Sequence, residues 1–238
     1  MKLPRAFYLL TIGGFLSPLF GQTVKQDNDQ PDTASQPPTQ TYGRIEGSTY
    51  ISPTGVFKMK IPVLPQLGGT VADTPNSVTF DDDYSIHVSV GAFPLTQELK
   101  WEFEKRGTKD FLVYFFTNIV MPDFAARCPG AQMEQNATFI GKYQDGTMLI
   151  FTLLPGGSFF EQRARFSRSL TPVVAKRGNL CFVKYAHVFV VTTELAERAL
   201  ERSAYKKPTD EENAILRQRL MDVVGKMQFI EPAPQTKG

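Results

Sequence analysis

The sequence predicts an α+β protein with a largely antiparallel sheet and helices packed on its faces. Short runs of alternating apolar residues are joined by turn residues, which favours hairpins over βαβ crossovers. Each group of strands is followed by two segments with apolar residues at helical spacing, which predicts a pair of helices. Of the 238 residues, 42% are hydrophobic and 21% are charged, as in globular proteins, and the net charge of +2 is too balanced to predict a nucleic-acid partner.

The two ends of the chain differ from its middle. Residues 1–21 combine basic residues, an apolar run and a small final residue, which predicts a signal peptide and export to the periplasm or the cell exterior. An uncleaved anchor is the alternative, and no other segment is long and apolar enough to cross a membrane. Residues 22–41 are rich in Gln, Asp, Pro, Ser and Thr, which predicts a disordered linker, and 231–238 form a similar flexible tail. A single domain is therefore expected over residues 42–230.

This domain is expected to open with a hairpin. Phe57, Met59 and Ile61 alternate with Val56 and two lysines, which predicts a half-buried strand. The preceding Ser-Pro-Thr-Gly has the residues of a tight turn. Pro62 ends the strand because proline cannot donate to a ladder.

A second hairpin and a helix pair are expected next. Residues 77–93 contain two strand-like runs joined by three aspartates, and His87 shares its strand face with serines. Thr96 is placed to cap a helix, Gly107 to interrupt it and Pro122 to end it.

The second half repeats this order. Residues 137–154 predict a hairpin around an Asp-Gly turn. Residues 179–192 are apolar on both faces, which predicts one central strand covered on both sides. A helix is expected over 194–207, and a last helix is expected to begin with a capping box of Thr209 and Glu212.

The opening hairpin and the element order are similar to those of PsbP-like domains. The resemblance also includes the secretory segment, the helix near the middle and a short final strand. It is carried mainly by Tyr50, Ser52, Pro53, Gly55, Phe57, Ile61 and Pro62. It implies an antiparallel sheet sandwiched by helices, an α/β/α sandwich. Since members of that family are mostly accessory or binding proteins, it also implies a binding role, without pointing to particular functional residues.

Basic residues gather in one hairpin-like region that suggests a partner-binding surface. Such residues suit an acidic protein partner, a phosphate group or anionic lipid head groups. A charged edge strand that resists aggregation is the alternative. The candidate contacts are Arg163, Arg165, Arg168, Lys176 and Arg177, together with the Phe159-Phe160 loop.

Chemistry is less evident. The sequence has no G-x-S-x-G, G-x-G-x-x-G, Walker A or H-E-x-x-H motif, so no catalytic residue and no cofactor are predicted, and Ser158 in Pro-Gly-Gly-Ser is expected in a flexible loop. The two histidines, His87 and His187, would form a metal site or a proton-transfer pair if the fold brought them near Asp81 and Asp83. Otherwise they are structural histidines, and the aspartates form a solvated turn.

Two cysteines remain. After export, Cys128 and Cys181 have the redox environment for a disulfide, and two buried thiols are the alternative.

These observations favour an exported, non-catalytic binding or accessory protein of the cell envelope that acts through the basic hairpin. The alternative is a metal-binding protein or hydrolase that uses the histidines and nearby carboxylates. A third possibility is a domain that holds an apolar ligand between sheet and helices.

Overall fold

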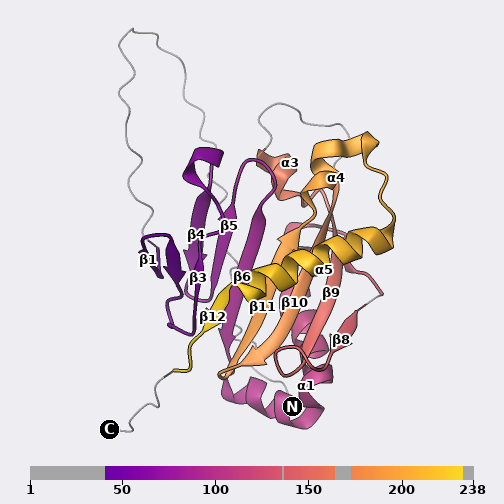
Figure 1. Cartoon of the computed structure of the whole chain (residues 1–238). Coiled ribbons are helices and arrows are strands. Elements are labelled where there is room, and N and C mark those ends of the chain that lie inside the picture. Colours follow the sequence, from indigo (N-terminus) through magenta and orange to yellow (C-terminus); the bar gives the residue numbers. More distant parts are fainter. Residues whose placement is uncertain (1–40, 136, 164–172, 233–238) are drawn as a thin grey trace, which may run out of the picture.

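The computed structural model describes residues 41–135, 137–163 and 173–232 (Figure 1). The predicted signal peptide and nearly all of the predicted linker lie outside this range. The described chain forms two sheets in which every strand pair is antiparallel, with helices packed alongside. The α+β fold with a largely antiparallel sheet is thereby confirmed.

The smaller sheet has four strands in the order β1-β2-β3-β12, so that the two ends of the fold meet in it. Its strands are β1 (Arg44–Glu46), β2 (Thr49–Ile51), β3 (Phe57–Lys60) and β12 (Met227–Phe229). The predicted opening hairpin is confirmed, because Ile51 pairs with Lys58 across the Ser-Pro-Thr-Gly turn.

The larger sheet has eight strands in the order β4-β5-β6-β11-β10-β9-β7, and β8 pairs with the far edge of β9. Its strands are β4 (Thr70–Thr74), β5 (Ser77–Asp81), β6 (His87–Pro94), β7 (Gln132–Met133), β8 (Thr138–Ile140), β9 (Thr147–Pro155), β10 (Val174–Lys184) and β11 (His187–Glu194). Both other predicted hairpins are present in it, as β5–β6 and β8–β9. The Asp-Gly turn has the expected positive φ values of 61° at Asp145 and 115° at Gly146.

The helices of the described residues are mostly short and lie in five stretches of the sequence. They are η1 (Pro65–Leu67), α1 (Gln97–Phe115), the π-helical turn η2 (Phe116–Val120), α2 (Met121–Arg127), α3 (Phe159–Arg163), α4 (Ala196–Glu201), η3 (Arg202–Ala204) and α5 (Thr209–Gly225). Within the described ranges, none of them is both long and apolar enough to span a membrane.

The elements form three layers, with the larger sheet in the middle. On the face seen in Figure 1, α5 crosses β10 and β11 and the smaller sheet covers β5 and β6. Tyr50, Phe57 and Phe80 contribute aromatic rings to the core on this side. On the opposite face, α1, η2 and α2 bury a second core that includes Phe111, Phe115 and Ile150.

Two helix predictions are wrong at their ends. Thr96 caps α1 and Gly107 interrupts it with a φ of 72°, as expected, but Pro122 does not end the helical region. It occupies the first turn of α2, directly after the π-helical turn η2, and the helical region continues through it to Arg127. The predicted capping box is also absent, because Thr209 lies inside α5 and the cap position is Pro208.

The predicted central strand over 179–192 is instead a hairpin. β10 and β11 are both central, and Tyr185 and Ala186 join them with φ values of 48° and 55°. These values define a type I′-like turn, which suits the twist of a hairpin. The helix expected over 194–207 is correspondingly shorter, because Glu194 still belongs to β11.

Candidate functional site

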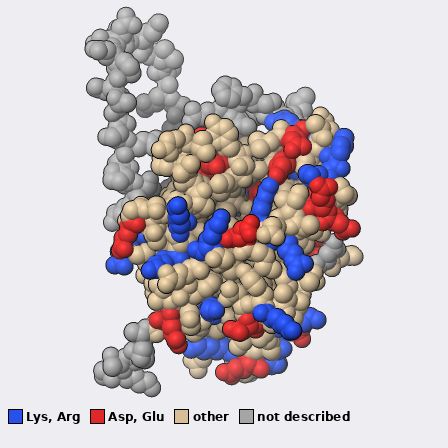
Figure 2. All heavy atoms as spheres, viewed as in Figure 1, with Lys and Arg blue, Asp and Glu red and all other residues tan. Residues whose placement is uncertain are grey.

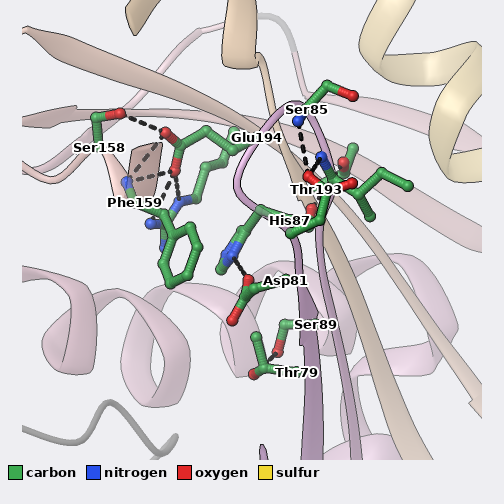
Figure 3. Close-up of polar contacts among 12 residues, drawn as sticks. Thr79, Asp81, Ser85, His87, Ser89, Ser158, Phe159, Thr193 and Glu194 are labelled. Carbon is green, nitrogen blue, oxygen red and sulfur yellow. Dashed lines mark hydrogen bonds and ion pairs between the residues drawn. The ribbon is translucent and has the colours of Figure 1, made fainter. Parts of the chain in front are cut away.

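One end of the larger sheet carries a group of buried polar side chains on the face opposite α5. They come from β5, β6, β10, β11 and the start of α3, and Figure 3 shows most of them converging. We call this group the His87 cluster, and it consists of Asp81, His87, Ser158, Phe159, Arg177 and Glu194.

The centre of the cluster is a hydrogen-bonded pair of Asp81 and His87. The register of β5 and β6 places the two residues opposite each other, and Asp81 Oδ1 lies 2.5 Å from His87 Nδ1. Both residues are only 6% exposed. The ring of Phe159 stacks on the imidazole with centroids 4.7 Å apart, so that α3 covers one side of the histidine.

Glu194 holds α3 in this position. Ser158 Oγ donates to its Oε1 over 2.7 Å, and the backbone N–H of Phe159 lies 3.2 Å from both carboxylate oxygens. Arg177 balances the charge, since its Nε donates to Glu194 Oε2 over 3.0 Å and its Nη2 to the carbonyl of Gly157. Glu194 is 1% exposed, and a buried carboxylate needs such partners. The predicted flexible loop at Ser158 is therefore wrong, because the side chain is buried and bonded.

The turn before His87 presents exposed apolar side chains. One carboxylate oxygen of Asp82 accepts hydrogen bonds from the N–H groups of Tyr84, Ser85 and Ile86, which fixes the turn. The N–H of Asp83 donates to the carbonyl of Leu67, which joins the turn to η1. Three large apolar residues are exposed there, and we call them the apolar rim: Leu64 at 57%, Leu67 at 39% and Tyr84 at 59%.

The two histidines do not meet. His187 pairs with Pro94 while Val88 pairs with Thr193, so the histidines lie at opposite ends of the β6–β11 ladder, about 20 Å apart. His187 bonds to the carbonyl of Tyr185 instead. Among the residues that the structure describes, no group of three or more His, Cys, Asp or Glu side chains is placed to hold a metal ion. The shared site of both histidines is therefore wrong, whereas the pair of His87 with an aspartate is real.

The predicted basic surface is divided among different environments. Lys176 is fully buried and pairs with Glu134 and Glu212, so it faces no partner. Arg177 belongs to the His87 cluster, and its side chain is 15% exposed.

Of the candidate residues before them, the structure describes Phe159, Phe160 and Arg163. Arg163 ends the helix α3, so it does not alternate along a strand with Arg165, and Phe160 is buried against α4. Arg165 and Arg168 lie outside the described residues.

The two cysteines are too far apart to pair. Cys181 lies opposite Met148, whereas the sulfur of Cys128 lies beside Gly157 and Leu154. Six residues of strand separate these places, about 20 Å, and a disulfide needs Cα atoms within about 7 Å. Both thiols are free, and burial raises the pKa of Cys181 far above its usual range.

Sequence reasoning missed Glu194 and the apolar rim. Glu194 was assigned to a helix start because acidic residues are common there. The sequence near Leu64, Leu67 and Tyr84 does not show that these side chains are exposed, because an apolar residue in a loop can be either buried or exposed. Only the three bonds to Asp82 follow a recognisable pattern, that of an aspartate opening a turn.

Comparison with known proteins gives structural likeness only. No family model matches the chain, and no curated protein matches it in sequence. The Ran-binding protein Mog1p of Saccharomyces cerevisiae is similar in structure, with a TM-score of 0.44 and 9% identity over 81% of this chain and 97% of that one. Cyanobacterial PsbP (CyanoP) from Synechocystis sp. PCC 6803 also has a TM-score of 0.44, with 12% identity over 76% of this chain and 91% of that one.

Proposed function

We propose that the chain is an exported binding protein that acts without catalysis as an accessory to a larger assembly of the cell envelope. The proposed contact surface is the end of the larger sheet that carries the apolar rim and α3, and the arginines that follow α3 in the sequence are proposed as further contacts. The single observation that carries the proposal is the exposure of Leu64, Leu67 and Tyr84 on one fixed turn and its neighbour.

Exposed side chains of this kind suit recognition of a protein. Tyrosine is enriched among the residues that contribute most to binding, and a few large apolar side chains often anchor an interface. The three bonds to Asp82 hold Tyr84 in place before a partner arrives, so little conformational entropy is lost on binding.

The His87 cluster supports the same surface from below. His87 directly follows the turn that carries Tyr84, and its stacking with Phe159 fixes α3 beside it. Arg163 at the end of α3, followed by Arg165 and Arg168, would add a basic margin suited to acidic groups of the partner.

The test is affinity capture from the envelope fraction with the full chain as bait. The variant Leu64→Ser/Tyr84→Ser is compared with Trp101→Ser/Leu200→Ser, whose parent side chains are similarly exposed at 56% and 55%. The proposal requires a protein that is lost with the first variant, retained with the second, and then binds the purified chain directly. Equal capture by both variants would count against the apolar rim.

Export needs its own measurement. We expect the chain to accumulate in the periplasm or the medium, with residues 1–21 removed and a new N-terminus near residue 22. Intact-mass analysis of the protein from each cell fraction measures whether residues 1–21 have been removed. A full-length chain found only in the cytosol would contradict export.

The pair of Asp81 and His87 favours a second candidate, proton transfer in a hydrolase. A carboxylate that fixes one imidazole nitrogen leaves the other for base catalysis. However, Ser158 Oγ donates to Glu194 and not to the histidine, so His87 does not activate Ser158 in this arrangement. Hydrolysis of p-nitrophenyl acetate that disappears in His87→Gln, with folding retained, would favour this candidate.

A further inference from the structure

The outer face of the smaller sheet is a basic surface away from the His87 cluster. Side chains alternate along these strands, and Tyr50, Phe57 and Met59 point into the core. Their neighbours in sequence therefore face outward. The pairing of β3 places Lys58 beside Ile51 and Gln228, and Lys60 beside Thr49.

Four basic residues gather on this face against one acidic residue. Arg44 lies opposite Ile51 at the edge strand β1, and Lys226 directly precedes β12, next to Lys60 in the register. Figure 2 shows several Lys and Arg side chains on the side of the molecule where Figure 1 places the smaller sheet. We call Arg44, Lys58, Lys60 and Lys226 the lysine face.

These charges are not neutralised within the fold. Among the described residues, no ion pair involves Lys58, Lys60 or Lys226, and Arg44 has only a loose 3.7 Å contact with the exposed Glu46. Elsewhere, basic residues such as Lys176 are held by carboxylates at 3.1 Å or less. The lysine face thus combines high local charge with basic groups that the described residues do not hold in close ion pairs.

We propose that the lysine face binds an anionic phospholipid surface. Lysines on flexible stems provide point charges without fixed geometry, which suits a fluid layer of phosphates better than a shaped protein site. Protein interfaces are depleted in lysine and enriched in arginine and aromatic residues, so a surface with three lysines is less typical of a protein partner.

The edge of the same sheet adds apolar side chains that suit a bilayer interface. Tyr42, two residues before Arg44, is 64% exposed, and Ile45, which pairs with Tyr50 and so lies on the other side of the edge strand, is 45% exposed. Tyrosine favours the boundary between lipid head groups and acyl chains. Basic residues beside exposed apolar ones are the combination that holds proteins on membrane surfaces without spanning them.

The test is cosedimentation of the full chain with vesicles of equimolar phosphatidylglycerol and phosphatidylcholine, against vesicles of phosphatidylcholine alone. Any contribution of residues 1–21 is common to all variants and is read from the neutral vesicles. Each lysine near an anionic surface changes affinity by about 5-fold, so Lys58→Gln/Lys60→Gln/Lys226→Gln should lose about 100-fold on the anionic vesicles.

The matched control removes the same charge from other exposed positions. The variant Lys100→Gln/Lys109→Gln/Lys142→Gln should change binding less than about 3-fold, because these lysines lie away from the sheet. Thermal unfolding of all variants checks that they remain folded.

Three results would overturn the proposal. One is equal binding to neutral and anionic vesicles by the unmodified chain. Another is an equal loss in the control variant, which would assign the effect to net charge alone. The third is tight binding of polyglutamate with no binding of vesicles, which would assign the face to an acidic protein segment. Because the lysine face and the apolar rim share no residue and are tested with different variants, failure here leaves the capture experiment unaffected.

Discussion

Replacing Lys176 by methionine is expected to lower the free energy of unfolding by about 3 kcal/mol. The Nζ of this fully buried lysine lies 2.8 Å from Glu134 Oε1 and 3.1 Å from Glu212 Oε2. Removing one partner from a buried ion pair costs about 3–5 kcal/mol, because the other charge stays behind without compensation. The low end applies here, since Glu212 keeps Arg198 at 2.6 Å and Glu134 is 13% exposed to water.

The assay is urea unfolding of the full chain followed by circular dichroism. With a slope of about 2 kcal/mol per molar, a loss of about 3 kcal/mol moves the midpoint by about 1.5 M. Lys142→Met, at an exposed position, is the control and should stay within about 0.5 kcal/mol. Adding Glu134→Leu to Lys176→Met should recover part of the loss, because it removes a carboxylate left without its cation. A midpoint for Lys176→Met close to that of the control would refute the reasoning.

Three further predictions concern acid, thiols and packing. Burial raises the pKa of Glu212, but hydrogen bonds from Arg198 and Lys176 outweigh this effect and lower the pKa overall. The contribution of Glu212 to the free energy of unfolding is therefore present above about pH 4.3, the usual pKa of a glutamate, and is lost as the pH falls through the folded-state pKa. Acid titration of the urea midpoint should show this loss below about pH 4, and Glu212→Gln should flatten it. Alkylation in denaturant without reductant should label both Cys128 and Cys181, because both thiols are free. Without denaturant, the buried Cys181 should stay unlabelled. If neither cysteine is labelled in denaturant, the two form a disulfide. Gly178→Ala should destabilise the fold by about 1–3 kcal/mol in thermal unfolding, because its Cβ would lie 2.8 Å from a leucine methyl of α5, and an unchanged melting temperature would show that α5 shifts freely.

The parts of the fold that the sequence predicts are those with local causes. The alternation from Phe57 to Ile61, the Asp-Gly turn and the Thr96 cap each depend on neighbours within a few residues, and all three are present. The fold class follows because strands from several hairpins pair with one another in antiparallel sheets, which bury their apolar faces under helices.

The parts that fail depend on tertiary contacts. Tyr185 and Ala186 have no turn preference, and their positive φ values cost energy that the long β10–β11 ladder offsets. Lys176 looks like an exposed strand lysine because sequence does not say which face α5 will cover. The role of Glu194 is also hidden in the sequence, because its partners Arg177 and Ser158 come near it only in the folded chain.

The two proposed surfaces differ in the physical origin of their binding, and salt separates them. Leu64, Leu67 and Tyr84 of the apolar rim carry no charge, so the part of the contact that these side chains make with a partner should weaken little as salt rises. The lysine face depends on screened charges, with a Debye length of about 10 Å at 0.1 M salt and about 3 Å at 1 M. Vesicle binding should therefore disappear at high salt while partner capture persists. If both contacts form on one molecule, membrane attachment raises the local concentration of the rim near a partner in the same bilayer, and the Lys58→Gln/Lys60→Gln/Lys226→Gln variant should then bind the partner normally in solution but less well on vesicles.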